Sequence, residues 1–134
     1  MFLPIAAFFV VRRNKGIYFV KDKSGLWALP GGILKETYRE GFRNFAHEQL
    51  YPYFDKIEIR KLRLIVAPRE KVSLGDRNVR CFVFFLKVHC SPKETALQNL
   101  WLAPMDTLVP QVVSPDIRWM LRYIERFEMQ SRRT

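Results

Sequence analysis

A motif near the start of the chain constrains its fold more than any other feature. Residues 25–32 read GLWALPGG, so a short apolar stretch runs directly into a Pro-Gly-Gly turn. Thr37 and Glu40 then have the spacing of a capping box, with Thr as the N-cap and Glu three residues later. This pattern predicts a strand, a tight turn and a helix over Tyr38–Leu50. Such a turn can bring peptide carbonyls and helix carboxylates around one hard cation.

Apolar runs elsewhere predict the remaining elements. An alternating pattern slips by one residue near Lys61, which indicates a bulged strand, and residues 69–77 are typical of a polar loop. Residues 104–108 are expected to open a turn of helix. The expected strands are Leu3–Val11, Gly16–Lys21, Leu26–Leu29, Lys56–Ala67, Arg80–His89 and Asn99–Ala103, and a closing helix follows Ser114. This order predicts an α/β (α+β) sandwich with a mixed sheet between two helices, and the 134 residues make one domain, 1–134.

The chain carries a large positive charge. Lys and Arg outnumber Asp and Glu by 23 to 13, which gives a net charge of +10. Because these cations are dispersed, two interpretations stay open: solvated faces that aid solubility, or a surface that attracts nucleotides or nucleic acid. Under the second interpretation, the predicted contacts for substrate phosphate are Arg12, just after the first expected strand, and Arg63 and Arg80 on later expected strands.

The cysteine, histidine and apolar content narrows the class of protein. Cys81 and Cys90 are nine residues apart on what reads as one strand, so they cannot bond to each other and should be reduced packing thiols. The two histidines give no zinc-site spacing, and any metal should be held by oxygen. No apolar run approaches the roughly 20 residues of a membrane span. We therefore expect a cytoplasmic protein without a signal peptide or membrane segment.

Three features occur in the order in which one enzyme family has them. They are the GLWALPGG approach, the capped helix and a late segment with Trp101, Pro104 and Leu108 at Trp-x-x-Pro-x-x-x-Leu spacing. Together they resemble the Nudix hydrolases, whose motif runs G-x5-E-x7-R-E-U-x-E-E-x-G-U, with U bulky and aliphatic. The resemblance implies a Nudix-like fold over nearly the whole chain. It also implies hydrolysis of a nucleoside diphosphate linked to another group, with Mg²⁺, or alternatively Mn²⁺, as cofactor.

The family motif is altered in this chain. One residue is missing between the Pro-Gly-Gly turn and Glu36, which takes the position of the first Glu. The family's Arg-Glu pair then falls on Asn44 and Phe45, and its Glu-Glu pair falls on Glu48 and Gln49. Of the three helix carboxylates usually credited with metal binding, the resemblance therefore retains Glu48 alone, while Gln49 keeps a neutral oxygen.

The resemblance also implies a set of metal ligands. These are Glu48, Gln49, Glu36 and the peptide carbonyl of Gly31 or Gly32, and Glu48 is also the implied catalytic residue. Such a set would hold one ion when a diphosphate supplies further ligands, and a second ion only poorly. Helical geometry places Gln49 within the buried stripe of the helix and Glu48 on its flank. Gln49 must then be satisfied either by the turn backbone or by a bound ligand.

Two questions stay open at this stage. The helix offers no general base, and the loop before the last strand, from which relatives often take one, offers Glu94. The alternative function is a catalytically impaired Nudix-fold module that binds nucleotide or RNA through its positive surface, because Phe45 occupies a ligand position. Nucleic acid and a second copy of the chain are therefore open as partners beside a nucleotide-type substrate.

Overall fold

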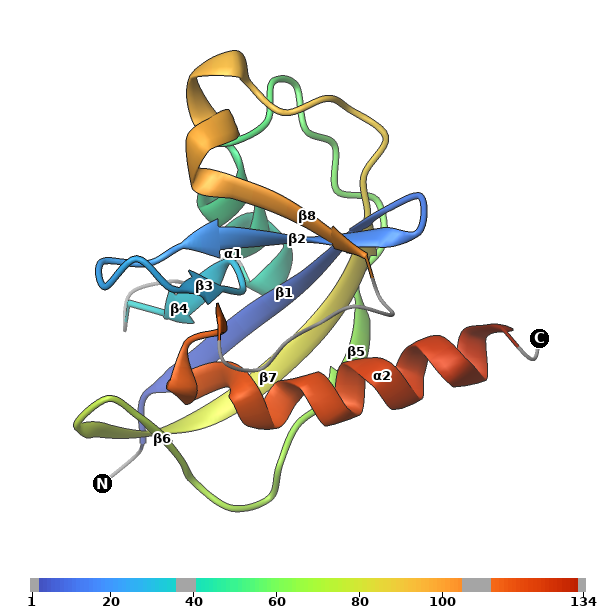
Figure 1. Cartoon of the computed structure of the whole chain (residues 1–134). Helices are drawn as coiled ribbons and strands as arrows, with labels where there is room; N and C mark the ends of the chain where they lie inside the picture. Colours follow the sequence, from blue (N-terminus) through green and yellow to red (C-terminus); the bar gives the residue numbers. More distant parts are fainter. Residues whose placement is uncertain (1–2, 36–40, 105–111, 133–134) are drawn as a thin grey trace.

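A mixed β-sheet lies between two helices. The computed structural model describes residues 3–35, 41–104 and 112–132. Figure 1 shows α1 (Gly41–Leu50) behind the sheet and α2 (Arg118–Arg132) in front of it. The α/β sandwich predicted from the sequence is therefore confirmed. Within the described ranges, no helix is both long and apolar enough to cross a membrane.

Strand β1 (Ile5–Arg13) is the axis of the sheet. On one side it runs parallel to β7 (Arg77–Lys87). On the other side it pairs antiparallel with β2 (Gly16–Lys21) and with β4 (Gly31–Ile33). The remaining strands extend the sheet through β2 and β7: β3 (Trp27–Ala28) and β8 (Leu100–Pro104) pair with β2, and β5 (Arg63–Val66) and β6 (Val72–Leu74) pair with β7.

Side chains of β1 alternate between two hydrophobic cores, one on each face of the sheet. Phe8 and Val10 belong to the core that α2 covers, whereas Phe9 and Val11 belong to the core that α1 covers. Residues 81–86 of β7 are buried or half-buried on both faces, as the continuous apolar run there predicted. The helices complete the cores with the apolar stripes expected of them: Met120 and Ile124 from α2, with Ile117 just before it, and Phe45, Ala46 and Leu50 from α1.

The strand predicted over Lys56–Ala67 was wrong in extent. Only Arg63–Val66 forms β5, because the pairing with β7 stops opposite Phe85. The alternating apolar residues before β5 instead pack into the core on the α1 face without strand pairing. The predicted bulge is present, but the register shifts within β5 itself and not near Lys61. Periodicity therefore predicted which side chains are buried, but not which backbone is paired.

The sequence prediction lacks two short strands. β4 continues the Pro-Gly-Gly turn along β1, and β6 forms a hairpin with the start of β7 inside the segment predicted as a polar loop. Each has three residues, too few for a periodic pattern to be visible. The predicted start of α1 and most of the helical turn expected at residues 104–108 lie outside the described residues.

Candidate active site

The Pro-Gly-Gly turn is held tightly against β1. Gly31 lies opposite Phe8 in the antiparallel pairing, and the Phe9 N–H donates a hydrogen bond to the Pro30 carbonyl over 2.9 Å. Gly31 has a φ of +144°, and a Cβ at this position would overlap the carbonyl oxygen of Ala7. Only glycine fits this close approach of two backbones. The turn is therefore a rigid part of the sheet.

Helix α1 brings Gln49 to a cavity beside this turn. Gln49 is half-buried and lines the cavity, whereas Glu48 is exposed and is not among the described lining residues. This confirms the helical-geometry prediction that Gln49 lies within the stripe and Glu48 on its flank. Phe45, at the family's carboxylate position, is buried, with its ring centroid 6.0 Å from that of Phe9. Phe45 therefore packs in the hydrophobic core on the α1 face.

We call the space between the turn and α1 the glycine-turn cavity. Its volume is about 350 Å³, at the small end of ligand pockets. Its apolar wall comes from the sheet and from the segment before α2, and includes Phe8, Val20, Leu29 and Ile117. Its polar lining residues are Asp22, Gln49, Tyr53, Ser114 and Asp116, together with the glycines of the turn. The cavity thus offers an apolar surface beside a few polar groups, as small-molecule sites do.

The segment before α2 supplies two of these polar residues. The Ser114 N–H donates to the Trp27 carbonyl over 2.7 Å, and Val113 forms a parallel bridge with Trp27. These contacts dock the short 3-10 helix Pro115–Ile117 beside β3, with Asp116 exposed. The sequence predicted this stretch only as a helix start. Its contribution to the cavity was missed because the contact with β3 joins segments far apart in the chain.

Asp22 lines the cavity, but hydrogen bonds already engage its carboxylate. Its Oδ1 accepts hydrogen bonds from the Ser24 N–H over 2.9 Å, the Ser24 hydroxyl over 2.7 Å and the Leu26 N–H over 2.9 Å. Burial raises the pKa of Asp22, but these hydrogen bonds and one from Ser114 together lower the pKa below its ordinary value. Asp22 is therefore an ionised acceptor that shapes the turn after β2.

The other predicted site residues do not line the glycine-turn cavity within the described part of the chain. Glu94 is exposed at the first position of the 3-10 helix before β8, and Arg80 is exposed on β7. Arg63 begins β5, and its guanidinium carbon lies 5.1 Å from the ring centroid of Phe127. Glu36 lies outside the described residues. The structure thus brings Gln49 and the two glycines together, and leaves these four apart from them or undescribed.

Arg12 is tied to helix α2. Its Nη1 lies 2.9 Å from one carboxylate oxygen of Glu128 and donates a hydrogen bond to the other over 3.1 Å. Its Nε donates to the Asn14 carbonyl over 3.0 Å. Glu128 is only 3% exposed, so its charge depends on Arg12 for compensation. This pair links β1 to α2, and Arg12 is not among the described residues that line the cavity.

The oxygen donors near the turn suit one hard cation. The Gln49 amide and the peptide carbonyls of the turn are ligand types that Mg²⁺ accepts. Glu48, the other predicted ligand on the helix, is exposed and is not among the described lining residues. Among the residues that the structure describes, no group of three or more His, Cys, Asp and Glu side chains could hold a metal ion. The described donors therefore fit one ion that takes further ligands from water and phosphate, and do not fit a centre of several ions.

Solved structures share this architecture. A MutT Nudix hydrolase from Burkholderia pseudomallei matches with a TM-score of 0.68 at 15% identity, over 90% of this chain and 97% of that one. An ADP-ribose pyrophosphatase from Streptococcus suis matches with a TM-score of 0.63 at 13% identity, over 93% and 91% of the two chains. The chain has the Nudix fold. The C-terminal domain of mouse MUTYH, solved in complex with human PCNA, also matches, with a TM-score of 0.65 at 18% identity over 92% and 88%.

The similarity of this chain to Nudix structures is found by comparing structures and not by comparing whole sequences. No protein-family model matches the sequence, and no curated protein sequence matches it. The GLWALPGG stretch nevertheless forms β3 and β4 of the Nudix fold. Trp101 on β8 packs beside it, with its ring centroid 5.8 Å from that of Trp27 and 5.9 Å from that of Phe19. Leu108 lies outside the described residues.

Proposed function

We propose that this chain hydrolyses a phosphoanhydride bond in a nucleoside diphosphate linked to another group, with Mg²⁺ or Mn²⁺ as the required cation. The observation that carries the proposal is the glycine-turn cavity, in which Gln49, Gly31 and Gly32 lie together within a Nudix fold. One structural neighbour, the ADP-ribose pyrophosphatase, is named for a substrate of this class. The apolar wall beside polar groups suits a ligand with both a base and phosphates.

Each part of the cavity has a role in this proposal. Phe8, Leu29 and Ile117 would bind the apolar portion of the substrate and exclude water from it. Ser114 would hold Asp22 in place at the polar end, through the hydrogen bond that its hydroxyl donates to that carboxylate. Because Gly31 cannot carry a side chain, the substrate would approach the backbone of the turn closely.

The cation would be held by oxygen atoms of α1 and the turn. Gln49, Glu48 and the carbonyl of Gly31 or Gly32 are the proposed ligands, and Glu36 remains a further predicted ligand. A bound cation would polarise the phosphoanhydride and orient the leaving phosphate. Gln49 is the central group here, because its half-buried amide needs a partner and already lines the cavity.

Glu94 and Asp116 are the two candidates for the general base. Glu94 is the residue predicted from the sequence, but it is exposed on the 3-10 helix before β8 and is not among the described lining residues. Asp116 lines the cavity, and Asp22, the other carboxylate there, is held by hydrogen bonds. We therefore propose Asp116 as the residue that accepts a proton from the attacking water.

A substrate panel tests the function. The purified protein is incubated with ADP-ribose, nucleotide sugars, dinucleoside polyphosphates and nucleoside triphosphates, with Mg²⁺, Mn²⁺ or chelator, and ³¹P NMR identifies the products. We expect turnover of a nucleoside diphosphate derivative that needs the cation and falls about tenfold or more in Glu48→Ala and Gln49→Leu. The matched control is Lys23→Glu, an exposed residue that lines neither cavity described in this chain.

Two results of the substrate panel would contradict the proposed function. Turnover that is equal in wild type, Glu48→Ala and Gln49→Leu would show that a contaminant or another site is responsible. Binding of nucleotides by folded wild-type protein without any cation-dependent turnover would overturn the proposal, and would identify a nucleotide-binding module on a Nudix fold.

A further inference from the structure

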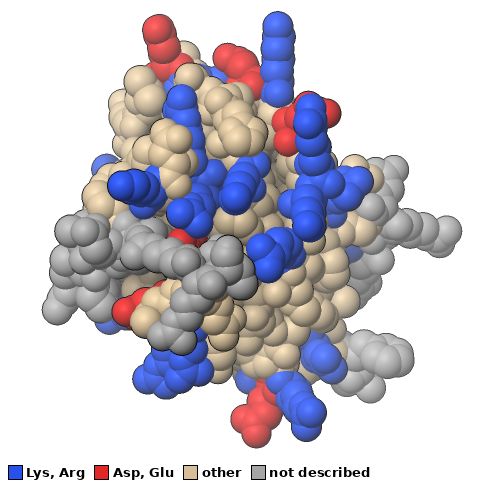
Figure 2. Space-filling model, turned by 90° about the vertical axis from the view of Figure 1, so that its right-hand side faces the viewer, with Lys and Arg blue, Asp and Glu red and all other residues tan. Residues whose placement is uncertain are grey.

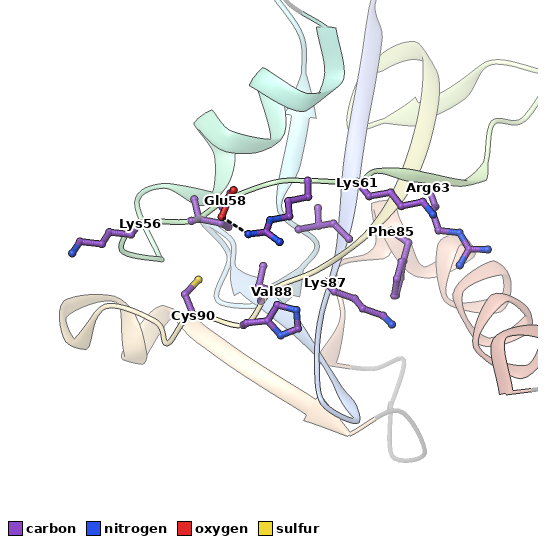
Figure 3. Close-up of a pocket in the computed structure, with 12 residues that line it drawn as sticks. Lys56, Glu58, Lys61, Arg63, Phe85, Lys87, Val88 and Cys90 are labelled. Atoms are coloured by element: carbon purple, nitrogen blue, oxygen red, sulfur yellow. Dashed lines mark hydrogen bonds and ion pairs between the residues drawn. The ribbon is translucent and has the colours of Figure 1, made fainter.

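A second cavity shares no lining residue with the glycine-turn cavity. Its volume is about 620 Å³, within the range of small-molecule sites. It opens between residues 56–63 and residues 85–90, and we call it the basic cleft. Figure 3 shows its two walls, with Lys56, Glu58, Lys61 and Arg63 along one and Phe85, Lys87, Val88 and Cys90 along the other.

The cleft forms where two strands separate. The pairing of β5 with β7 stops opposite Phe85, and the chain before β5 runs on without strand pairing. Both walls are nevertheless fixed by hydrogen bonds. Arg43 of α1 donates to the Arg60 carbonyl over 3.0 Å, and the Val88 N–H donates to the Arg12 carbonyl over 2.9 Å. The cleft is therefore a built feature of the fold.

The backbone of β7 contributes a polar edge to the cleft. Peptide groups along a strand face alternate sides. Since the Val88 N–H donates toward β1, the peptide groups of Lys87 face the opposite side, where β5 no longer pairs. Lys87 also lines the cleft. The N–H and the carbonyl oxygen of Lys87 are therefore both directed toward the side on which the cleft lies.

The cleft combines an apolar floor with a cationic rim. Ile57, Leu86 and Val88 on the floor are buried. Glu58 is the single carboxylate among the described lining residues. Five exposed cations line the same space: Lys56, Arg60, Lys61, Arg63 and Lys87. Figure 2 shows Lys and Arg side chains gathered over this face of the molecule, with few Asp and Glu among them.

Most of this charge has no internal compensation. Within the described part of the chain, no hydrogen bond or ion pair engages the side chains of Lys56, Lys61 and Lys87. Glu58 lies 3.2 Å from Arg60, but both side chains are more than two-thirds exposed, so the pair contributes little. Five cations around one cleft repel one another and raise the local concentration of anions.

The charge and shape of the cleft favour phosphate over carboxylate ligands. A phosphate monoester carries nearly two charges at neutral pH, whereas an acidic side chain carries one. A site with five cations around about 620 Å³ matches the denser charge. Phe85 is buried, and His89 is the one exposed ring among the described lining residues, so the cleft offers little surface on which bases could stack. Recognition would then act through the phosphates themselves.

We infer that the basic cleft is a second anion site, which binds a chain of two or more phosphate groups independently of the glycine-turn cavity. Two sources present a chain of phosphate groups: a free oligophosphate, whose terminal groups carry the denser charge, and the backbone of a single-stranded nucleic acid, whose phosphodiesters carry one charge each. Lys61 and Lys87 lie on opposite walls of the cleft and are the central contacts. The Arg60 and Arg63 guanidiniums provide planar donors for phosphate oxygens.

Calorimetric titrations in the presence of chelator test the inference without the proposed hydrolysis. The probes are inorganic tripolyphosphate, a single-stranded oligonucleotide and a poly-glutamate peptide of equal charge. The double variant Lys61→Glu/Lys87→Glu should weaken the binding of both phosphate probes about tenfold or more. The double variant Lys61→Gln/Lys87→Gln should weaken their binding less. The matched control is Lys23→Glu/Arg122→Glu, which makes the same change in net charge at exposed positions that line neither cavity.

The titrations separate every alternative. Tripolyphosphate binding that survives Gln49→Leu supports the cleft as the site, and tighter binding of the oligonucleotide would assign the phosphates to nucleic acid. Equal weakening by the cleft and control variants would overturn the inference, because binding would then follow net charge alone. Poly-glutamate binding as tight as that of tripolyphosphate would also overturn it, in favour of an acidic protein segment.

Discussion

The glycine-turn cavity and the basic cleft arise in opposite ways. The glycine-turn cavity exists because backbones approach closely: β4 pairs with β1, and Gly31 leaves no room for a side chain. The basic cleft exists because two backbones separate, where β5 stops pairing with β7. The first is shaped by buried residues that the fold needs, and the second is charged by exposed residues that the fold does not need.

This difference predicts how each cavity responds to substitution. Changes at the glycine turn should lower stability and activity together, because the turn is part of the sheet. Changes of rim cations in the cleft should alter binding with little effect on stability, because exposed side chains away from packed features usually contribute less than about 0.5 kcal/mol.

The largest expected effect concerns the rigidity of the glycine turn. Gly31→Ala should lower the free energy of unfolding by about 3 kcal/mol, because the new Cβ would overlap the Ala7 carbonyl at a φ of +144°. The control is Gly32→Ala, where no atom lies within 4 Å of the added Cβ and the expected loss is about 1 kcal/mol. Urea unfolding measures both. Equal losses would show that the close approach to β1 does not constrain the turn.

The Arg12–Glu128 pair is expected to act on folding and on neither cavity. Glu128→Gln should lower the free energy of unfolding by about 2 to 3 kcal/mol, since it leaves a mostly buried guanidinium without its counter-charge. Glu125→Gln, at an exposed position of the same helix, is the control. The double variant Arg12→Met/Glu128→Leu should recover most of the loss. Arg12→Met that keeps full stability but loses substrate affinity would instead support the phosphate contact predicted for Arg12.

Substitution of two carboxylates tests which of them is the general base of the glycine-turn cavity. Asp116→Asn should reduce kcat by about 10² with little change in KM, because Asp116 lines the cavity where water must be activated. Glu94→Gln should change kcat less than twofold, because Glu94 is exposed outside it. The reverse pattern would restore Glu94 as the general base.

The smallest expected effect is a pH dependence of stability from Asp22. Hydrogen bonds lower the pKa of Asp22 in the folded state, so its stabilising contribution is complete above the unfolded value of about 3.9 and is lost as the pH falls through the folded value. Asp22→Asn should therefore lower the free energy of unfolding by about 1 kcal/mol at pH 7, and the difference between variant and wild type should shrink below about pH 4. Urea midpoints at several pH values measure it, with exposed Asp76→Asn as the control. A difference that stays constant with pH would contradict the assignment.

Local sequence signals predicted the first cavity in part. The Pro-Gly-Gly motif located the turn, and helical periodicity placed Gln49 within the buried stripe of the helix and Glu48 on its flank. Ser114 and Asp116 could not be found this way, because only the docking of their segment on Trp27 brings them to the cavity. The fold was predictable wherever apolar runs were long, and it was missed at the three-residue strands β4 and β6.

The basic cleft was less accessible to sequence reasoning. Alternating apolar residues before β5 predicted a longer strand, and a longer strand paired with β7 would close the space in which the cleft lies. The residues there are buried by packing without pairing, which periodicity cannot distinguish from a paired strand. Net charge indicated an affinity for polyanions, but not where the cations converge.

The stoichiometry of Mn²⁺ binding in the presence of a non-hydrolysable ADP derivative tests the central claim most directly. Titration followed by electron paramagnetic resonance should show one Mn²⁺ per complex of protein and ligand. The affinity of this complex for Mn²⁺ should be at least tenfold weaker in Gln49→Leu and unchanged in Lys23→Glu. Ligand affinity that is the same with Mn²⁺ and with chelator, and insensitive to Gln49→Leu, would contradict a cation site at the glycine turn.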